Sequence, residues 1–326
     1  MRTPSRSTSA TSTTATSTTA TGATATAPTS MREAFGETMS ELLDEDLSTV
    51  LVLADISRQY FRQAEAEHPE RVINVGIREQ LLVNVGAGLA LSGLRPVVHT
   101  FSTFLVERAF EQIKLGFGHQ DVGGVLVSVG GSYDVSSGGR THQGPGDVAL
   151  VDTLPDFDIH VPGHPVEARR LLRDAVAGDG RVYLRLTEDS NAQARPTGSM
   201  SVERRGARGS VIAVGPTLDS VLTATEGLDV TVLYASTIRP FDAATLTRTL
   251  GFADVILVEP YAVGTSAWHV SQALRHVPHR LLSLGVPRAE LRSYGSPRDH
   301  QRAHDLDAAG LRRSITDFLD ADTAAR

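Results

Sequence analysis

Apolar and polar residues follow a regular alternation of helical and strand spacing from Met31 onward. Apolar side chains recur at helical spacing between Ala34 and Leu43 and form one stripe. The continuous apolar run 50–54 comes next and is typical of a strand buried on both faces. Because helix and strand patterns keep alternating, the chain is predicted to have an α/β fold with mostly parallel sheets. Further strands are predicted at 71–75, 96–100, 124–129, 158–161 and 182–186, and helices at 79–91, 105–115 and 165–177.

The alternation stops after residue 190, and this divides the chain. Residues 191–208 contain Asn, Pro and Gly without sustained periodicity and are predicted to be a linker. A second, smaller unit follows over 209–326, so we expect two consecutive three-layer α/β domains, the first over 31–190. This second unit carries no obvious catalytic cluster. Its strands are predicted at 210–214, 230–234 and 254–259, and its helices at 218–226, 242–250 and 265–276.

The first 30 residues differ in composition from the rest of the chain. They are nearly all Thr, Ser and Ala, and they are predicted to be a disordered tail because they offer no apolar face. Their basic, Ser-rich and acid-poor character leaves an organelle transit peptide open as an alternative.

Charge and residue usage narrow the classes of function. Lys and Arg total 31 against 38 Asp and Glu, which gives a net charge of −7 without a basic block, so a nucleic-acid-binding surface is not expected. The absence of cysteine excludes disulfides and thiolate nucleophiles, and it agrees with a reducing, cytoplasmic location. No run of 18 apolar residues predicts a membrane span. Small-molecule chemistry is therefore the favoured class.

Glu79 is the first candidate for chemistry. It lies at a predicted strand-to-helix junction in the segment NVGIREQ (74–80). In open α/β sheets, ligands bind in the crevice at the carboxyl ends of the strands. Apolar neighbours within 75–85 would desolvate the carboxylate and raise its pKa, a state suited to sharing a proton. An acid that only stabilises the first turn of a helix is the simpler alternative.

Two further segments follow predicted strands. His142 lies in the glycine-rich loop GGRTHQGPG (138–146), where the backbone can approach a ligand closely and an imidazole can exchange protons near neutral pH. Phe101 and Phe104 lie in TFSTF (100–104), and such rings can pack on a flat heterocycle. Arg108 would lie one helical turn after Phe104. A solvated loop histidine and ordinary core aromatics are the alternatives.

Taken in order, VGIREQ, HTFSTF and GGRTHQG resemble three motifs of transketolase-type thiamine-diphosphate enzymes. Residues 31–190 are similar to the pyrimidine-binding domain of that family, and 209–326 to its C-terminal domain. The resemblance implies that Glu79 hydrogen-bonds the pyrimidine ring of thiamine diphosphate and promotes its deprotonation, while His142 contacts the substrate and assists proton transfer. The implied reaction transfers a two-carbon ketol unit from a ketose or 2-oxo donor to an aldehyde.

The resemblance also implies a set of contacts. Phe104 is the expected stacking partner of the pyrimidine, and Arg108 is expected near the amino group of that ring. Cofactor contacts are implied for Glu79, Phe101, Phe104, Arg108, Asp55 and Ile77, and substrate contacts for Arg32, His99, His142 and Arg185.

One part of the family pattern is missing. The family binds diphosphate and Mg²⁺ or Ca²⁺ through Gly-Asp-Gly and an Asn some thirty residues later. Gly178-Asp179-Gly180 ends a predicted helix, where Gly is expected at a turn, and no Asn occurs near 200–215. Because residues 1–30 are of low complexity, we do not expect them to form that domain. The chain thus resembles the β-type half of a split transketolase, which implies a partner subunit that supplies the metal site, in an α2β2 heterotetramer, and no metal ligand on this chain.

Departures from the pattern concern the substrate. Gly138 stands where the family usually has Asp, and Gly130 where a phosphate-binding His falls, so we expect a substrate other than an ordinary pentose phosphate. Three alternatives stay open. The first is the β subunit of a 2-oxoacid dehydrogenase. The second is a 1-deoxyxylulose-phosphate-synthase-like half, suggested by the segment STFL (102–105) and by Arg185. The third is a non-catalytic regulatory subunit.

Overall fold

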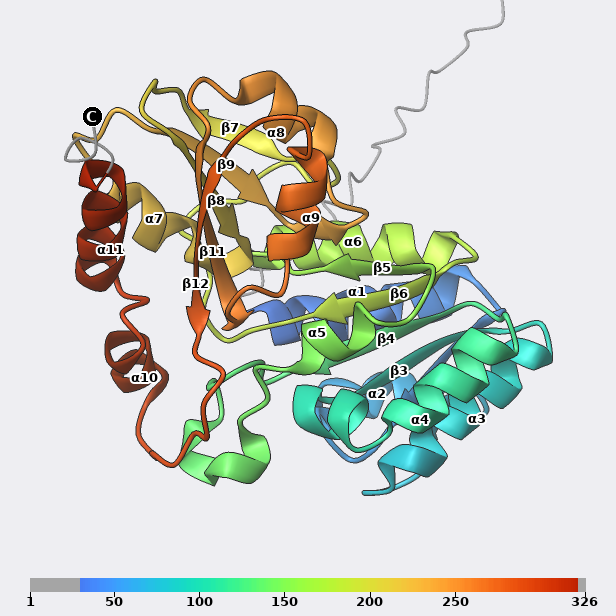
Figure 1. The fold of residues 1–326 in the computed structure, drawn as a ribbon. Helices are drawn as coiled ribbons and strands as arrows, with labels where there is room; N and C mark the ends of the chain where they lie inside the picture. The colour runs from blue at the N-terminus through green and yellow to red at the C-terminus, as the bar shows by residue number, and fades with distance from the viewer. Residues whose placement is uncertain (1–29, 322–326) are drawn as a thin grey trace, which may run out of the picture.

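The computed structural model describes residues 30–321 and contains two sheets, each covered by helices on both faces (Figure 1). The disordered tail predicted for 1–30 lies outside the described residues except for Ser30. All strands of the first sheet are parallel except β10, which is antiparallel to β5. In spatial order this sheet contains β10 (Thr237–Arg239), β5 (Phe157–His160), β6 (Arg181–Arg185), β4 (Gly124–Val129), β3 (Arg95–Phe101), β1 (Thr49–Leu53) and β2 (Val72–Asn74).

Helices cover both faces of the first sheet and make three layers. One face packs against α1 (Met31–Glu45), α2 (Arg62–Glu67) and α6 (Pro165–Ala177). The other face packs against α3 (Glu79–Leu91), the segment 103–119 and α5 (Asp147–Val151). Every residue of β1 is buried, as its continuous apolar run predicts.

The second sheet has the same layered construction. Its edge strand β7 is antiparallel and the rest are parallel. Helices α7 (Leu218–Ala224) and α11 (Ala308–Asp320) cover one face, and α8 (Ala243–Thr249) and α9 (Ala267–Ala273) cover the other. In spatial order the strands are β12 (Arg280–Val286), β11 (Asp254–Ala262), β8 (Ser210–Val214), β9 (Thr231–Ala235) and β7 (Ser201–Arg204).

The structure differs from the sequence pattern at several places, three of which bear on the site or on the boundary between the two units. The helix predicted for 105–115 is instead two π-helical turns, Thr103–Glu107 and Ile113–His119, around the short helix α4 (Phe110–Gln112). The segment predicted as a linker contains β7, which pairs with β9. Strand β10 belongs to the second unit in sequence but joins the edge of the first sheet. Strands of three or four residues are too short to show a period in the sequence.

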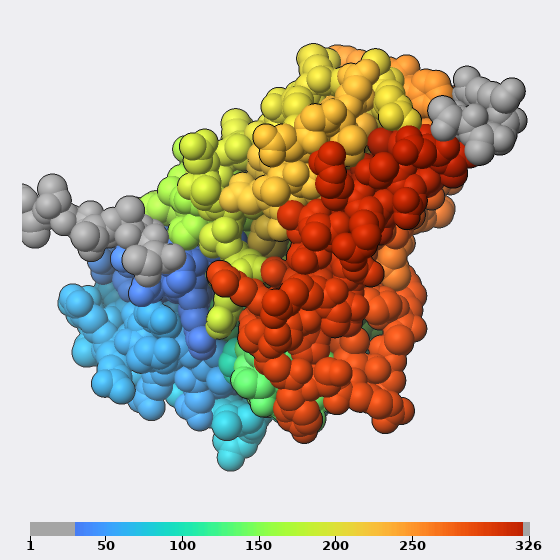
Figure 2. Space-filling view, turned by 90° about the vertical axis from the view of Figure 1, so that its left-hand side faces the viewer, coloured from blue at the N-terminus to red at the C-terminus, as the bar shows by residue number. Residues whose placement is uncertain are grey.

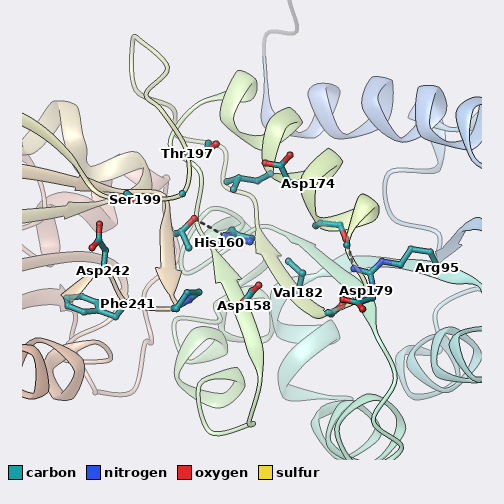
Figure 3. Close-up of a pocket in the computed structure, with 17 residues that line it drawn as sticks. Arg95, Asp158, His160, Asp174, Asp179, Val182, Thr197, Ser199, Phe241 and Asp242 are labelled. Carbon is teal, nitrogen blue, oxygen red and sulfur yellow. Dashed lines mark hydrogen bonds between the residues drawn. The ribbon is translucent and has the colours of Figure 1, made fainter. Parts of the chain in front are cut away.

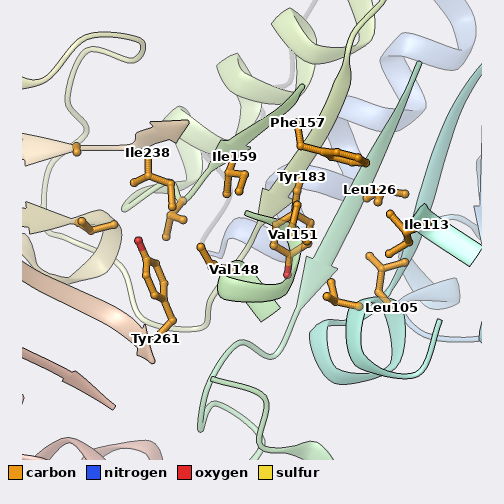
Figure 4. Packing of buried hydrophobic residues seen from close by; sticks show 14 of the residues in the cluster. Leu105, Ile113, Leu126, Val148, Val151, Phe157, Ile159, Tyr183, Ile238 and Tyr261 are labelled. Carbon is orange, nitrogen blue, oxygen red and sulfur yellow. The ribbon is translucent and has the colours of Figure 1, made fainter. Parts of the chain in front are cut away.

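The two units share one hydrophobic core at their junction. Figure 4 shows Tyr261 and Ile238 of the second unit lying near Val148 of α5 in the first, and all three belong to one buried cluster. This packing fixes α5, and with it the end of the glycine-rich loop that precedes α5. Between residues 30 and 321, no helix combines the length and the apolar character needed to cross a membrane.

Candidate active site

Glu79 is the first residue of α3 and follows a tight turn at the end of β2. Gly76 adopts φ +70° in this turn, and the Asn74 side chain accepts the Gly76 amide hydrogen at 3.0 Å. Asn74 also donates to Asp55 Oδ1 at 2.7 Å, which ties the ends of β1 and β2 together. The Glu79 residue is 2% exposed, and Arg108 donates to its Oε2 at 2.8 Å. The carboxylate is thus buried and paired with a cation.

The surroundings of Glu79 differ in part from the expectation. Leu82 and Val83 of α3 are fully buried, but Ile77 is 68% exposed and Leu81 is 44% exposed. Those two apolar side chains therefore do not enclose the carboxylate within this chain. They are exposed two residues before and two residues after Glu79 in the sequence.

Phe104 lies on a π-helical turn and Arg108 caps its end, in place of the α-helical turn predicted for them. The Arg108 amide donates to the Thr103 carbonyl at 3.1 Å, which is the five-residue spacing of a π-helix. The guanidinium carbon of Arg108 is 4.1 Å from the centre of the Phe104 ring, and the same guanidinium binds Glu79. One cation therefore joins the acid to the aromatic ring.

His142 lies against both aromatic rings. Its ring centre is 5.1 Å from that of Phe104 and 5.8 Å from that of Phe101, in edge-to-face geometry. A Cβ atom at Gly138 would lie only 2.7 Å from Cγ and Nδ1 of His142. Any side chain at position 138 must therefore displace this imidazole, which gives a physical reason for glycine where the family usually has Asp.

Arg32 is positioned by a chain of hydrogen bonds from the centre of the first sheet. His99 Nδ1 donates to the Val127 carbonyl at 2.9 Å, so Nε2 is the acceptor and receives the Ser57 hydroxyl hydrogen at 2.7 Å. Arg32 Nε then donates to Ser57 Oγ at 2.7 Å. Burial, with a smaller effect from the charge of Arg32, lowers the pKa of His99 to about 3, so the imidazole is neutral.

The structure corrects the substrate contact predicted for His99. The residue is fully buried and does not line the pocket beside Arg32. It acts on Arg32 only through Ser57. That pocket has a volume of about 230 Å³, and Phe101 forms the wall between it and His142. Its lining residues are Ser30, Arg32, Tyr60, Phe101, Val129, Gly130, Thr187 and Glu188.

Arg185 also departs from its predicted role. Its side chain is fully buried, with Nε donating to Asp147 Oδ2 at 2.7 Å and a terminal nitrogen donating to Ser132 Oγ at 2.7 Å. The Asp147 side chain is fully buried too. This ion pair joins β6 to α5 beneath the glycine-rich loop and does not contribute to the Arg32 pocket. Asp55 and Ile77 lie in or beside the Glu79 turn, and their cofactor contacts stay predictions.

A segment of the second unit holds the loop that carries His142 (Figures 1 and 2). Ser136 Oγ donates to the Gly295 carbonyl at 2.6 Å, and Gln143 Nε2 donates to the Ser293 carbonyl at 2.9 Å. The Arg140 side chain makes an ion pair of 3.0 Å with Glu290. The second unit therefore contributes to the site by holding this loop, which the sequence pattern did not predict.

Three contributors were missed from the sequence, namely Ser57, Tyr60 and Glu188. Glu188 follows β6 and Ser57 follows β1, so the general rule that sites form at the carboxyl ends of parallel strands could have suggested both. Tyr60 lies in a single turn of 3₁₀ helix and carries no such signal.

A second pocket lies between α6, the first sheet and the segments 197–199 and 237–242 (Figure 3). Its volume is about 690 Å³, and its lining includes Arg95 and Val182 near the amino ends of β3 and β6. Asp179 of the Gly-Asp-Gly triplet lies there, and Arg95 donates to the Gly180 carbonyl at 2.8 Å. Across residues 30–321, the carboxylate and imidazole group that could converge on a metal ion is Asp44, Glu67 and His68, which does not include Asp179.

Fold and site together have the arrangement of a pyrimidine-binding domain of thiamine-diphosphate enzymes. Residues 27–193 match the family model described as "Transketolase, pyrimidine binding domain". The chain therefore belongs to that family. A protein of Rhodococcoides fascians, described as "Uncharacterized 33.6 kDa protein in fasciation locus", is 54% identical over 297 residues, which cover 89% of this chain and 95% of that protein.

Other relatives are longer. The 1-deoxy-D-xylulose-5-phosphate synthases of Acidovorax ebreus and Leptothrix cholodnii are 30% and 32% identical over 303 and 306 residues. These matches cover 89% and 88% of this chain but 48% and 47% of the enzymes, so the chain spans about half the length of these curated relatives.

Solved structures give the same picture. A structure titled "Split gene transketolase, inactive beta4 tetramer" superposes with a TM-score of 0.78 at 25% identity, covering 89% of this chain and 98% of that one. Transketolase from Campylobacter jejuni superposes with a TM-score of 0.73 at 19% identity over 88% of this chain and 46% of that one, which shows the fold alone.

Proposed function

We propose that this chain is the pyrimidine-binding subunit of a transketolase-like, thiamine-diphosphate-dependent enzyme. It transfers a two-carbon ketol unit from a ketose or 2-oxo donor to an aldehyde, together with a partner subunit that holds the diphosphate and Mg²⁺. The observation that best supports this function is a series of contacts that runs from buried Glu79 through Arg108 and Phe104 to His142. It places an acid, an aromatic ring and a proton carrier side by side.

The residues present fit the pyrimidine end of the cofactor. Glu79 Oε2 is held by Arg108, which leaves Oε1 to share a proton with a ring nitrogen. Phe104 lies in the same contact series and supplies an aromatic surface for a flat heterocycle.

Each residue has a separate task in this proposal. Glu79 holds and shares one proton, and Arg108 orients its carboxylate. Thr141 Oγ1 lies 3.0 Å from His142 Nδ1, so Nε2 is the nitrogen that faces the substrate and moves a proton to or from its oxygen. When bound, thiamine diphosphate supplies the nucleophilic carbon and the electron sink for breaking a carbon–carbon bond.

The exposed side chains of Ile77 and Leu81 support the proposal that a partner subunit binds beside Glu79. They flank Glu79, and apolar side chains exposed beside a site are typical of a protein interface. The structural neighbour titled "Split gene transketolase, inactive beta4 tetramer" is, by that title, inactive as a tetramer of β chains, which agrees with a need for a second kind of subunit. We propose an α2β2 assembly in which the interface completes the cofactor site.

The test is co-expression with candidate partner chains that carry Gly-Asp-Gly and a downstream Asn. The purified complex is given thiamine diphosphate and Mg²⁺, and both ketol transfer and exchange of the cofactor C2 proton with deuterium are followed. Glu79→Gln keeps the shape but cannot share a proton as a carboxylate, so both rates should fall by about 10²–10⁴-fold. Glu226→Gln, at an exposed residue of the turn that follows α7, is the matched control. Equal exchange rates in wild type and Glu79→Gln would exclude the assigned role.

A second candidate is a 1-deoxyxylulose-phosphate-synthase-like half. The relatives at 30–32% identity favour it, because they are enzymes of that name. Condensation of pyruvate with glyceraldehyde 3-phosphate by the same complex, with release of CO₂, distinguishes this reaction from ketol transfer.

A further inference from the structure

The pocket beside Arg32 contains two opposite charges that remain unpaired. Arg32 donates through Nε to Ser57, but its two terminal nitrogens have no hydrogen-bond partner in the described part of the chain. Glu188 lines the same pocket, and its carboxylate makes no ion pair among residues 30–321. The two groups attract each other without forming an ion pair. A ligand between them has to accept hydrogen bonds from the guanidinium and donate one to the carboxylate.

Aromatic rings form the walls of this pocket. The guanidinium carbon of Arg32 is 5.9 Å from the ring centres of both Tyr60 and Phe101. Such walls shield the carbon skeleton of a ligand from water, while Ser30 and Thr187 add hydroxyl groups at the rim. The combination of aromatic faces with paired polar groups suits a molecule that is hydroxylated along a carbon chain.

The charge of the pocket does not suit a phosphate. A phosphate dianion is held by several cationic or N–H donors, whereas Arg32 is the only cation among the lining residues and Glu188 opposes it. The N-terminus of α1 at Ser30 adds a partial positive charge, but the acidic Glu33 in its first turn offsets that charge. The pocket is therefore close to neutral.

The shape of the pocket excludes a cationic side chain at position 130. Gly130 adopts φ +67°, and a Cβ atom there would lie 2.8 Å from the Phe101 ring and 2.9 Å from Val135. A longer side chain at this position would have to displace Phe101, which separates the pocket from His142. Glycine at 130 and the position of Phe101 thus depend on each other.

We propose that this pocket binds the unphosphorylated, hydroxylated end of a sugar-like substrate, with a hydroxyl group bridging Arg32 and Glu188. A hydroxyl group can accept from the guanidinium and donate to the carboxylate at the same time. The volume of about 230 Å³ is below the ~300 Å³ at which pockets for whole drug-sized ligands begin, so it takes one end of a small molecule. The other end of the substrate would extend past Phe101 toward His142. This direction rests on the proposed function.

Binding of two unreactive polyols tests the proposal. Ribitol and ribitol 5-phosphate differ only in the phosphate, and neither has a carbonyl group, so neither can donate a ketol unit. Binding to the full chain, alone and in complex with its partner, is measured by saturation-transfer NMR. We expect ribitol to bind and ribitol 5-phosphate to bind at least about tenfold more weakly, because the phosphate faces Glu188.

Glu188→Gln supplies the decisive comparison. Removing this exposed negative charge should shift the ribitol to ribitol 5-phosphate affinity ratio toward the phosphate by about tenfold. Glu226→Gln should leave the ratio unchanged. Tighter binding of the phosphate by wild type, no binding of ribitol, or an unchanged ratio in Glu188→Gln would each overturn the proposal. Because binding is measured without turnover, its outcome is separate from that of the ketol-transfer assay.

Discussion

The buried pair Arg185–Asp147 allows a quantitative test of what Arg185 does. Arg185→Met removes the guanidinium and leaves the Asp147 carboxylate without its cation, although both side chains are fully buried. Removing one partner of a buried ion pair costs about 3–5 kcal/mol. The Tyr183 hydroxyl still donates to Asp147 at 2.7 Å, so we expect the lower end, about 3 kcal/mol.

Thermal unfolding measures this cost. For a unit of 150–250 residues, a loss of about 3 kcal/mol corresponds to a fall in Tm of roughly 6–12 °C. Asp147→Asn added to Arg185→Met removes the unpaired charge and keeps an acceptor for Tyr183, so it should recover much of the loss. Arg313→Met breaks the exposed pair with Asp305 and is the matched control, expected to cost about 0–1 kcal/mol.

The same variant decides between the two roles considered for Arg185. If Arg185→Met melts within about 2 °C of wild type and instead raises the KM of the active complex for its donor, Arg185 contacts the substrate and the structural role is refuted. A fall in Tm that the added Asp147→Asn reverses supports the structural role.

Three further predictions follow from the site. Gly138→Asp should displace the loop histidine and lower turnover at least about tenfold with little change in Tm, whereas Ser137→Asp, with the same charge one residue earlier, should not. Ile77→Asp should weaken partner binding, as measured by analytical ultracentrifugation, more than Leu115→Asp does, because Ile77 lies beside Glu79; equal effects would place the interface elsewhere. The pKa of His99 is about 3 in the folded chain and 6.5 in the unfolded chain, so its contribution to stability is complete above pH 6.5 and is lost as pH falls toward 3. His99→Gln should therefore show a smaller fall in Tm between pH 7 and pH 5, and an unchanged fall would contradict this account.

Long periodic elements could be predicted from the sequence. The helices predicted at 79–91 and 165–177 have those bounds in the structure, because each has an apolar stripe that packs on the first sheet. The run 50–54 was predictable as a strand because a parallel sheet covered on both faces excludes water from every position. Strand β10 could not be predicted, because its pairing with β5 depends on the docking of the two units rather than on local sequence.

Site residues that lie in the three sequence motifs could be predicted. The role of a strand residue could not be predicted, because it depends on the face of the sheet to which its side chain points. Glu79, Phe104 and His142 meet because each follows a different strand of one sheet. Arg185 ends β6, and successive side chains of a strand point to opposite faces, so its direction decides its role. It points toward α5 and pairs with Asp147, and the sequence carries no signal for that direction.

The position of His142 depends in part on the second unit. Gly138 and Gly139 offer no side chains to fix the backbone, and Gly139 has φ +72°. Gly295 and Ser293 add rigidity from outside the loop by accepting hydrogen bonds from loop side chains. A catalytic group works only when it is held close to its productive geometry. In the proposed function, the second unit therefore contributes to the active site by holding the loop of His142, and we expect a truncation that removes this unit to leave the proposed proton carrier without a fixed position.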